Sequence, residues 1–155
     1  MKKINWKILI SCLIVVYLVA FIGSIFTSQN TNSEWYLSIR PSITPPSYVF
    51  PIVWNILFFL IALSLYLCWT SSIKKSTIIL FFGLNFFFNI LWSVFYFSLK
   101  NPLFAFLDIL LLLLSTLLLL KLSYKLNKKA FYLVIPYFLW LVFATILNYL
   151  SIHKL

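Results

Sequence analysis

The chain has 155 residues, of which 64% are hydrophobic and 9% are charged, whereas soluble domains carry about 25% charged residues. This leaves too little polar surface to cover a water-soluble globule, so a single membrane domain over residues 1–155 is expected. Nucleic-acid binding is not expected despite the net charge of +10. The lysines stand in short groups between apolar runs and form no basic face.

Five apolar segments follow one another along the chain. Each is close to the roughly 20 residues that cross about 30 Å of hydrocarbon, and in lipid each must satisfy its own backbone as a helix. The predicted spans are residues 8–26, 50–70, 76–99, 102–120 and 130–152. The sequence therefore predicts an all-α integral membrane protein, a bundle of five transmembrane helices.

The first span needs separate consideration, because Lys2 and Lys3 precede it as they would precede the apolar core of a signal peptide. That core is usually about 7–15 residues long and is followed by a cleavage site of small residues. The run here is longer and no clear A-x-A site follows it. We therefore expect the first helix to be retained.

The distribution of Lys and Arg predicts the orientation. The N-terminal segment and the connections 71–75 and 121–129 share one side of the membrane and carry nine lysines, whereas the other side carries only Arg40, Lys100 and Lys154. Loops rich in Lys and Arg stay in the cytoplasm. The expected location is a bacterial plasma membrane, with the N-terminus inside and the C-terminus outside.

The only long connection covers residues 27–49. It holds Trp35 and Tyr36, and then three prolines between Arg40 and Ser47 that restrict the backbone. Long ordered loops often serve as lids or binding loops. A plain connector is the alternative, with the aromatic pair anchored at the membrane interface.

Aromatic and polar residues repeat along one face of several spans. Spacings of three, four and seven residues place side chains on the same side of a helix. The stripes are Trp54, Phe58 and Ala62; Asn85, Asn89, Trp92 and Tyr96; Asp108 and Ser115; and Tyr137, Trp140, Ala144 and Asn148. Facing one another, they would line an apolar cavity with a few polar groups, suited to broad flat ligands. The alternative is plain helix packing, with Asn side chains bonded across helices.

Asp108 is the only carboxylate inside a span. Intramembrane charges are costly, so we expect it to face the bundle interior, either protonated or paired with an Asn or Ser. No second acid accompanies it, which leaves two-carboxylate catalysis unsupported. Cys12, Cys68 and the C-terminal His153 have no metal-ligand spacing, so no metal site is expected.

Several segments resemble signatures of the TspO/MBR family, in the same order and at similar spacing from about residue 35 to 149. They are Arg40-Pro41-Ser42-x-Thr44-Pro45-Pro46 with Val53-Trp54; Asn89-x-x-Trp92-Ser93-x-Phe95; Asp108; and Pro136-Tyr137-x-x-Trp140-x-x-Phe143-Ala144-x-x-Leu147-Asn148-Tyr149. Several such motifs together are specific, although any one alone is weak.

The resemblance implies a five-helix bundle whose ligand cavity is closed by the first loop. It implies binding of porphyrins such as protoporphyrin IX or haem, and of sterols, isoquinolines or benzodiazepines. No cofactor is required, since the porphyrin is ligand or substrate. The ligand-binding residues so indicated are Tyr36, Pro45, Trp54, Phe58, Asn89, Trp92, Asp108, Tyr137, Trp140, Ala144 and Asn148.

The resemblance leaves the type of activity open. Some bacterial relatives degrade porphyrin in light and oxygen, which would make Trp54 and Trp140 candidate catalytic residues, expected on opposite walls of one cavity. The alternatives are a receptor or sensor of tetrapyrrole metabolism, a light-dependent porphyrin-degrading enzyme, a porphyrin or lipid transporter, and a scaffold. Trp6 and Trp69, next to lysines, are expected to be interfacial anchors.

Three further features depart from the family pattern or add to it. Ile43 stands where the family usually has Trp, which removes one aromatic from the loop. Leu147, Tyr149 and Lys154 fit a proposed sterol motif. The expected partners are a porphyrin or sterol-like molecule and the lipid bilayer, without nucleic acid; a homodimer is a further option, although the small-residue pattern around Gly83 is weak.

Overall fold

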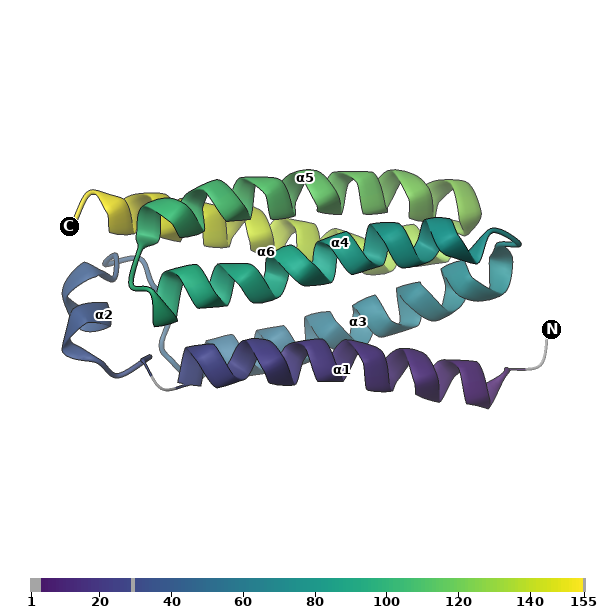
Figure 1. The fold of residues 1–155 in the computed structure, drawn as a ribbon, viewed down its shortest axis with the longest axis horizontal. Helices are drawn as coiled ribbons and strands as arrows, with labels where there is room; N and C mark the ends of the chain where they lie inside the picture. Colours follow the sequence, from purple (N-terminus) through teal and green to yellow (C-terminus); the bar gives the residue numbers. More distant parts are fainter. Residues whose placement is uncertain (1–3, 29, 155) are drawn as a thin grey trace.

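The computed structural model describes residues 4–28 and 30–154, and all regular structure in them is helical (Figure 1). Lys2 and Lys3, used above in the charge argument, lie outside the described residues. The elements are α1 (Trp6–Ser28), α2 (Glu34–Ile39), α3 (Val49–Ser71), α4 (Lys75–Ser93), the π-helical turn η1 (Val94–Ser98), α5 (Pro102–Leu126) and α6 (Lys128–Ile152).

Five helices in the described part of the chain are long and apolar enough to cross a membrane, namely α1, α3, α4 with η1, α5 and α6. At 1.5 Å per residue, helices of this length reach about 35 Å, slightly more than the hydrocarbon thickness. The predicted five-helix membrane fold is confirmed. The fourth span was placed too short, because α5 continues past Lys121 and Lys125 to Leu126.

The bundle is apolar outside and partly polar inside. Large apolar side chains such as Leu111, Leu114 and Ile146 are 48, 54 and 47% exposed. The buried polar residues are Ser64, Asn85, Asn89, Ser93, Asp108, Ser115, Thr116, Ser123, Asn148 and Ser151. This distribution suits lipid as the surrounding solvent, because polar groups in a membrane must find partners within the protein.

The helices pack in a compact order that differs from their order in the chain. α5 lies against α4 and α6, α3 lies against α1 and α6, and α1 also contacts α4. The Trp6 end of α1 and the Ile152 end of α6 lie at opposite ends of the bundle, and α2 lies at the Ile152 end (Figure 1). All five long helices therefore reach the end that α2 covers.

Side-chain caps determine where several helices begin. The Asn101 side chain accepts from the Phe104 amide at 3.0 Å, directly before Pro102 at the start of α5, and Asn127 caps α6 through the Lys129 amide at 2.9 Å. Ser33 accepts from the Tyr36 amide at 3.2 Å and starts α2. This short helix was not predicted within the loop, although Ser followed by Glu34 is a common helix start.

The C-terminal end of α4 changes its hydrogen-bond pattern. In η1 the Leu99 amide donates to the carbonyl of Val94 at 2.9 Å, five residues earlier. Such π-helical turns are rare and often occur at functional sites. Lys100 then adopts a φ of 50°, which reverses the chain into α5.

Candidate ligand-binding site

A cavity of about 400 Å³ lies inside the bundle, at the end that α2 covers. This volume lies in the range of small-molecule sites, about 300–1,000 Å³. All five long helices and the 30–48 connection contribute to its wall. Its lining includes Gly23, Thr27, Tyr36, Thr44, Phe50, Trp54, Phe58, Asn89, Trp92, Tyr96, Leu112, Trp140, Ala144 and Asn148.

Aromatic rings form the broad surfaces of the wall. Trp54 stacks on Phe58 with ring centroids 5.4 Å apart, and Trp92 stacks on Tyr96 at 5.2 Å. The Trp140 ring packs edge to face against the Phe50 ring of α3. Trp54 on α3 and Trp140 on α6 line the same cavity, and the two helices pack against each other. That the two indoles occupy opposite walls stays a prediction.

Three polar side chains of the wall are hydrogen-bonded within the protein. Trp92 Nε1 donates to Asn148 Oδ1 at 3.0 Å, and Asn148 Nδ2 donates to the carbonyl of Pro102 at 2.8 Å. Asn89 Nδ2 donates to the Tyr137 hydroxyl at 3.2 Å. These residues therefore line the cavity and also hold α4, α5 and α6 together, so the two sequence-based interpretations apply to the same side chains.

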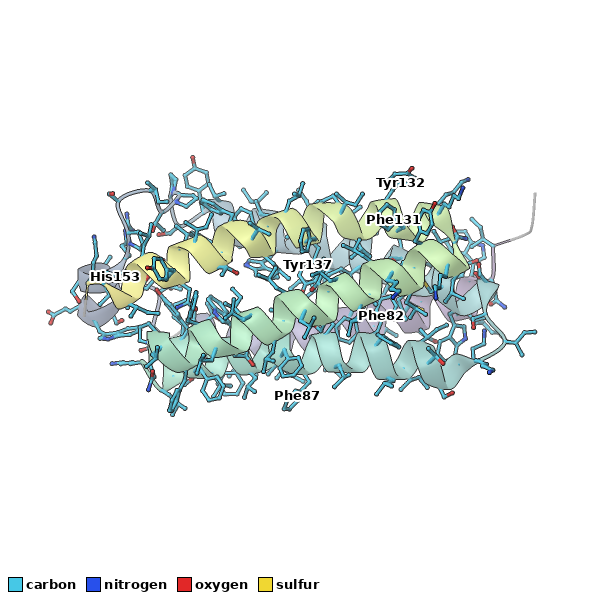
Figure 2. The ribbon with its side chains drawn as sticks, turned by 90° about the horizontal axis from the view of Figure 1, so that it is seen from above. Phe82, Phe87, Phe131, Tyr132, Tyr137 and His153 are labelled. Atoms are coloured by element: carbon cyan, nitrogen blue, oxygen red, sulfur yellow. The ribbon has the colours of Figure 1, made fainter. Side chains whose placement is uncertain are left out.

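Behind this wall lies a second polar layer. The Tyr137 hydroxyl donates to Asn85 Oδ1 at 3.1 Å, and Asn85 Nδ2 donates to Ser115 Oγ at 3.0 Å and Thr116 Oγ1 at 2.8 Å. Tyr137 is fully buried and lies in the middle of the bundle (Figure 2). It supports the wall from behind through Asn89 and has its ring edge against Trp54.

The first loop closes the cavity through α2. Ile39 is 2% exposed and packs with Tyr96, Phe97 and Ala105 of η1 and α5. Tyr36 lines the cavity, 5.7 Å from the Phe97 ring between centroids. The aromatic pair of the loop is therefore part of the lid over the cavity.

Two charged residues that do not line the cavity, Lys154 and Arg40, interact with this lid. Lys154 Nζ donates to the carbonyl of Arg40 at 2.9 Å and ties the C-terminal end to the loop. Burial raises the pKa of the Tyr36 hydroxyl above its ordinary value, and the positive charge of Arg40 partly opposes this. Tyr36 therefore stays neutral at physiological pH, because an ordinary phenol titrates near 10.

The structure brings together most, but not all, of the predicted ligand-binding residues. Those that line the cavity are Tyr36, Trp54, Phe58, Asn89, Trp92, Trp140, Ala144 and Asn148. Pro45 does not line it, although Thr44 and Ser47 on either side do. Tyr137 lies behind the wall, as described above.

Asp108 is also absent from the cavity wall, although the next residue on α5, Ile109, lines it. Asp108 is 3% exposed, so its expected position inside the bundle is confirmed. Neither carboxylate oxygen has a hydrogen-bond partner within the described residues, so the expected pairing with Asn or Ser is wrong.

The sterol-motif residues do not form one surface. Leu147 is 8% exposed and lines the cavity, whereas Tyr149 is 49% exposed and lies against Phe106 and His153. Lys154 is hydrogen-bonded to the carbonyl of Arg40 in the loop. The motif therefore joins two α6 residues that point in different directions and a lysine that lies beyond the end of this helix.

The contribution of α1 was missed by the sequence analysis. Ala20, Gly23, Ser24, Thr27 and Ser28 form part of the cavity wall. Small and hydroxyl side chains at the end of a span are the signal that could have found it, because they let neighbouring helices approach. The first helix is thus part of the site as well as a membrane span.

The fold and cavity define a five-helix membrane protein with a ligand-sized pocket inside the bundle, and sequence comparison supplies the family. The TspO/MBR family profile matches residues 11–153. Tryptophan-rich protein TspO of Archaeoglobus fulgidus is 36% identical over 147 residues, 91% of this chain and 92% of that one. The Bacillus cereus protein of the same name is 43% identical over 120 residues, 76% and 78% of the two chains. A tryptophan-rich sensory protein of Cereibacter sphaeroides is 29% identical over 118 residues, 75% and 73% of the two chains. This chain belongs to the TspO/MBR family.

Proposed function

We propose that this protein is a membrane receptor or sensor that binds porphyrins or sterol-like molecules inside its helical bundle. The observation that carries the proposal is the cavity of about 400 Å³, which Trp54, Trp92 and Trp140 line. Aromatic faces with sparse hydrogen-bonding groups suit planar ligands such as protoporphyrin IX, haem or isoquinolines. Such binding would serve to regulate tetrapyrrole metabolism.

A second candidate function is the light- and oxygen-dependent degradation of a bound porphyrin. The observation that favours it is that Trp54 and Trp140, the two tryptophans indicated by the family resemblance, line the same cavity. Indole is readily oxidised, so an excited porphyrin stacked on it would have an oxidisable neighbour. The same set of variants tests both functions.

Trp54→Phe and Trp140→Phe are each expected to weaken protoporphyrin IX binding about three- to tenfold, because lost stacking is worth about 0.5–1.5 kcal/mol. Trp69→Phe is the matched control, since Trp69 lies at the other end of α3 with Lys75 5.1 Å from its ring centroid. Porphyrin absorbance is titrated in the dark and then followed under light in air.

The outcomes separate the two functions. The enzyme is supported if the wild type degrades porphyrin in light and if Trp54→Phe and Trp140→Phe lower the rate of this loss far more than they lower affinity. Binding without any photochemistry in the wild type supports the receptor alone. Equal affinities in all three variants contradict the assignment of the cavity as the porphyrin site.

The orientation gives a further prediction. We expect the Trp6 end of α1 in the cytoplasm of a bacterial plasma membrane and the Ile152 end of α6 outside, because lysines gather at the Trp6 end. The connections beside Lys74 and Lys128 lie at that same end of the bundle (Figure 1). Phosphatase fusions at the C-terminus should be active and fluorescent-protein fusions dark. A fluorescent C-terminal fusion would reverse the proposed orientation.

A further inference from the structure

One end of the described bundle carries lysines and no acidic side chain. It is the end opposite α2, where α1, α4 and α6 begin and α3 and α5 end (Figure 1). The chain has only two acidic side chains, of which Glu34 starts α2 at the other end and Asp108 is buried inside α5. The positive charge is therefore not balanced by carboxylates of the protein. The described lysines at this end are Lys7, Lys74, Lys75, Lys121, Lys125, Lys128 and Lys129.

Two of these lysines share one face of α5. Lys121 and Lys125 are four residues apart, which places them on the same side of the helix, and both are exposed. Like charges at this spacing destabilise a helix slightly. Asp108 does not neutralise them, because it lies thirteen residues before Lys121, about 20 Å along the helix axis. An anion between the two ammonium groups would remove their repulsion.

Other lysines at this end have partners within the protein. Lys75 Nζ donates to the carbonyls of Trp69 and Ser72. Lys128 Nζ lies 5.8 Å from the centroid of the Tyr124 ring. Within the part of the chain that the structure describes, the ammonium groups of the α5 pair have no comparable contact, so they are available to a ligand from outside.

The same face of α5 is apolar further into the membrane. Leu114, Leu117 and Leu118 stand seven, four and three residues before Lys121, spacings that place them on its side of the helix, and all three are exposed. α5 has 25 residues, which makes it about 37 Å long beside a hydrocarbon layer of about 30 Å. The leucines therefore lie at the depth of acyl chains, whereas the two lysines near the helix end lie at the depth of lipid headgroups.

We propose that this face of α5 is a binding site for an anionic phospholipid, with the phosphate between Lys121 and Lys125 and the acyl chains along the three leucines. A soluble anion would meet the charges but leave the leucines uncovered. A zwitterionic lipid would cover the leucines but bring a cation of its own to the lysines. Basic clusters beside membrane spans attract anionic lipids. The inference depends neither on the ligand of the cavity nor on which end of the bundle is cytoplasmic.

The test measures lipid binding to the purified full chain, freed of lipid in neutral detergent at low salt. Dioleoylphosphatidylglycerol and dioleoylphosphatidylcholine have the same chains and differ in headgroup charge, and each is titrated in mixed micelles. Native mass spectrometry counts the bound lipid, and thermal unfolding is followed in parallel. We expect phosphatidylglycerol to bind the wild type more tightly than phosphatidylcholine and to raise its unfolding midpoint.

Paired substitutions on α5 locate the site. Lys121→Gln/Lys125→Gln should lower the affinity for phosphatidylglycerol about tenfold, whereas Lys121→Arg/Lys125→Arg should retain it. Lys7→Gln/Lys100→Gln is the matched control, because it removes the same net charge from exposed lysines on two other segments. Its affinity should equal that of the wild type. In lipid-free detergent the α5 Gln pair should unfold at or slightly above the wild-type temperature, because its like-charge repulsion is gone.

The outcomes distinguish a site from general attraction. Equal affinity of the wild type for the two lipids, or unchanged phosphatidylglycerol affinity in the α5 Gln pair, overturns the proposal. An equal loss in the control pair also overturns it, since net charge alone would then attract the lipid. Glycerol phosphate that binds as tightly as phosphatidylglycerol would replace the lipid site by one for a soluble anion. A loss confined to the α5 Gln pair supports the proposal.

Discussion

Ala144→Trp is expected to lower the affinity for protoporphyrin IX at least about a hundredfold, equivalent to about 2.8 kcal/mol. Ala144 lies in the cavity wall on α6, between Leu141 and Asn148 along the same face. An indole from this position occupies the space that a planar ligand needs, so the ligand loses both burial and stacking. Absorbance titration measures the loss directly.

Ile146→Trp is the control for this substitution. Ile146 lies two residues further along α6 and is 47% exposed on the outer face, so its replacement should leave affinity unchanged. Overpacking a core costs about 1–3 kcal/mol, so thermal unfolding in detergent must show that Ala144→Trp is folded. Wild-type affinity in folded Ala144→Trp would place the ligand outside this cavity.

Tyr137→Phe is expected to lower the stability of the bundle by about 1–3 kcal/mol, although it removes a single oxygen atom. The Tyr137 hydroxyl joins Asn85 and Asn89 at 3.1 and 3.2 Å in a fully buried position. Without it, buried amide atoms on α4 lose their partners. At about 2–4 °C per kcal/mol for a chain of this size, the midpoint should fall by several degrees.

Tyr132→Phe makes the same chemical change in an exposed position. Tyr132 lies on the same helix, is 64% exposed and points outward near the start of α6 (Figure 2). The unfolding midpoint of Tyr132→Phe should match that of the wild type. If both variants unfold like the wild type, the buried amides find other partners and the network is not a stability determinant.

Helix periodicity was enough to predict much of the cavity. Asn89, Trp92, Trp140, Ala144 and Asn148 were placed on common faces by spacings of three, four and seven residues, and the structure has them in one wall. Apolar runs near 20 residues likewise predicted the five spans. These features follow from geometry within single helices, which the sequence determines directly.

Features that depend on how helices face each other were not predictable in this way. Tyr137 shares a face with Trp140 but points behind the wall, and periodicity does not distinguish the two depths. The role of α1 was hidden because its apolar run predicts only a span, whereas its small residues matter through contacts with α3 and α4. The lack of a partner for Asp108 depends equally on neighbouring helices.

The π-helical turn η1 makes the attachment of the lid sensitive to helix phase. Both Tyr96 and Phe97 are buried there and hold Ile39 of α2. Adding or removing one residue in a helix rotates everything beyond it by about 100° relative to the rest. Shortening Val94–Ser98 by one residue would thus turn the chain entering α5 to a new angle. The length of this segment therefore sets the alignment between the transmembrane bundle and its cover.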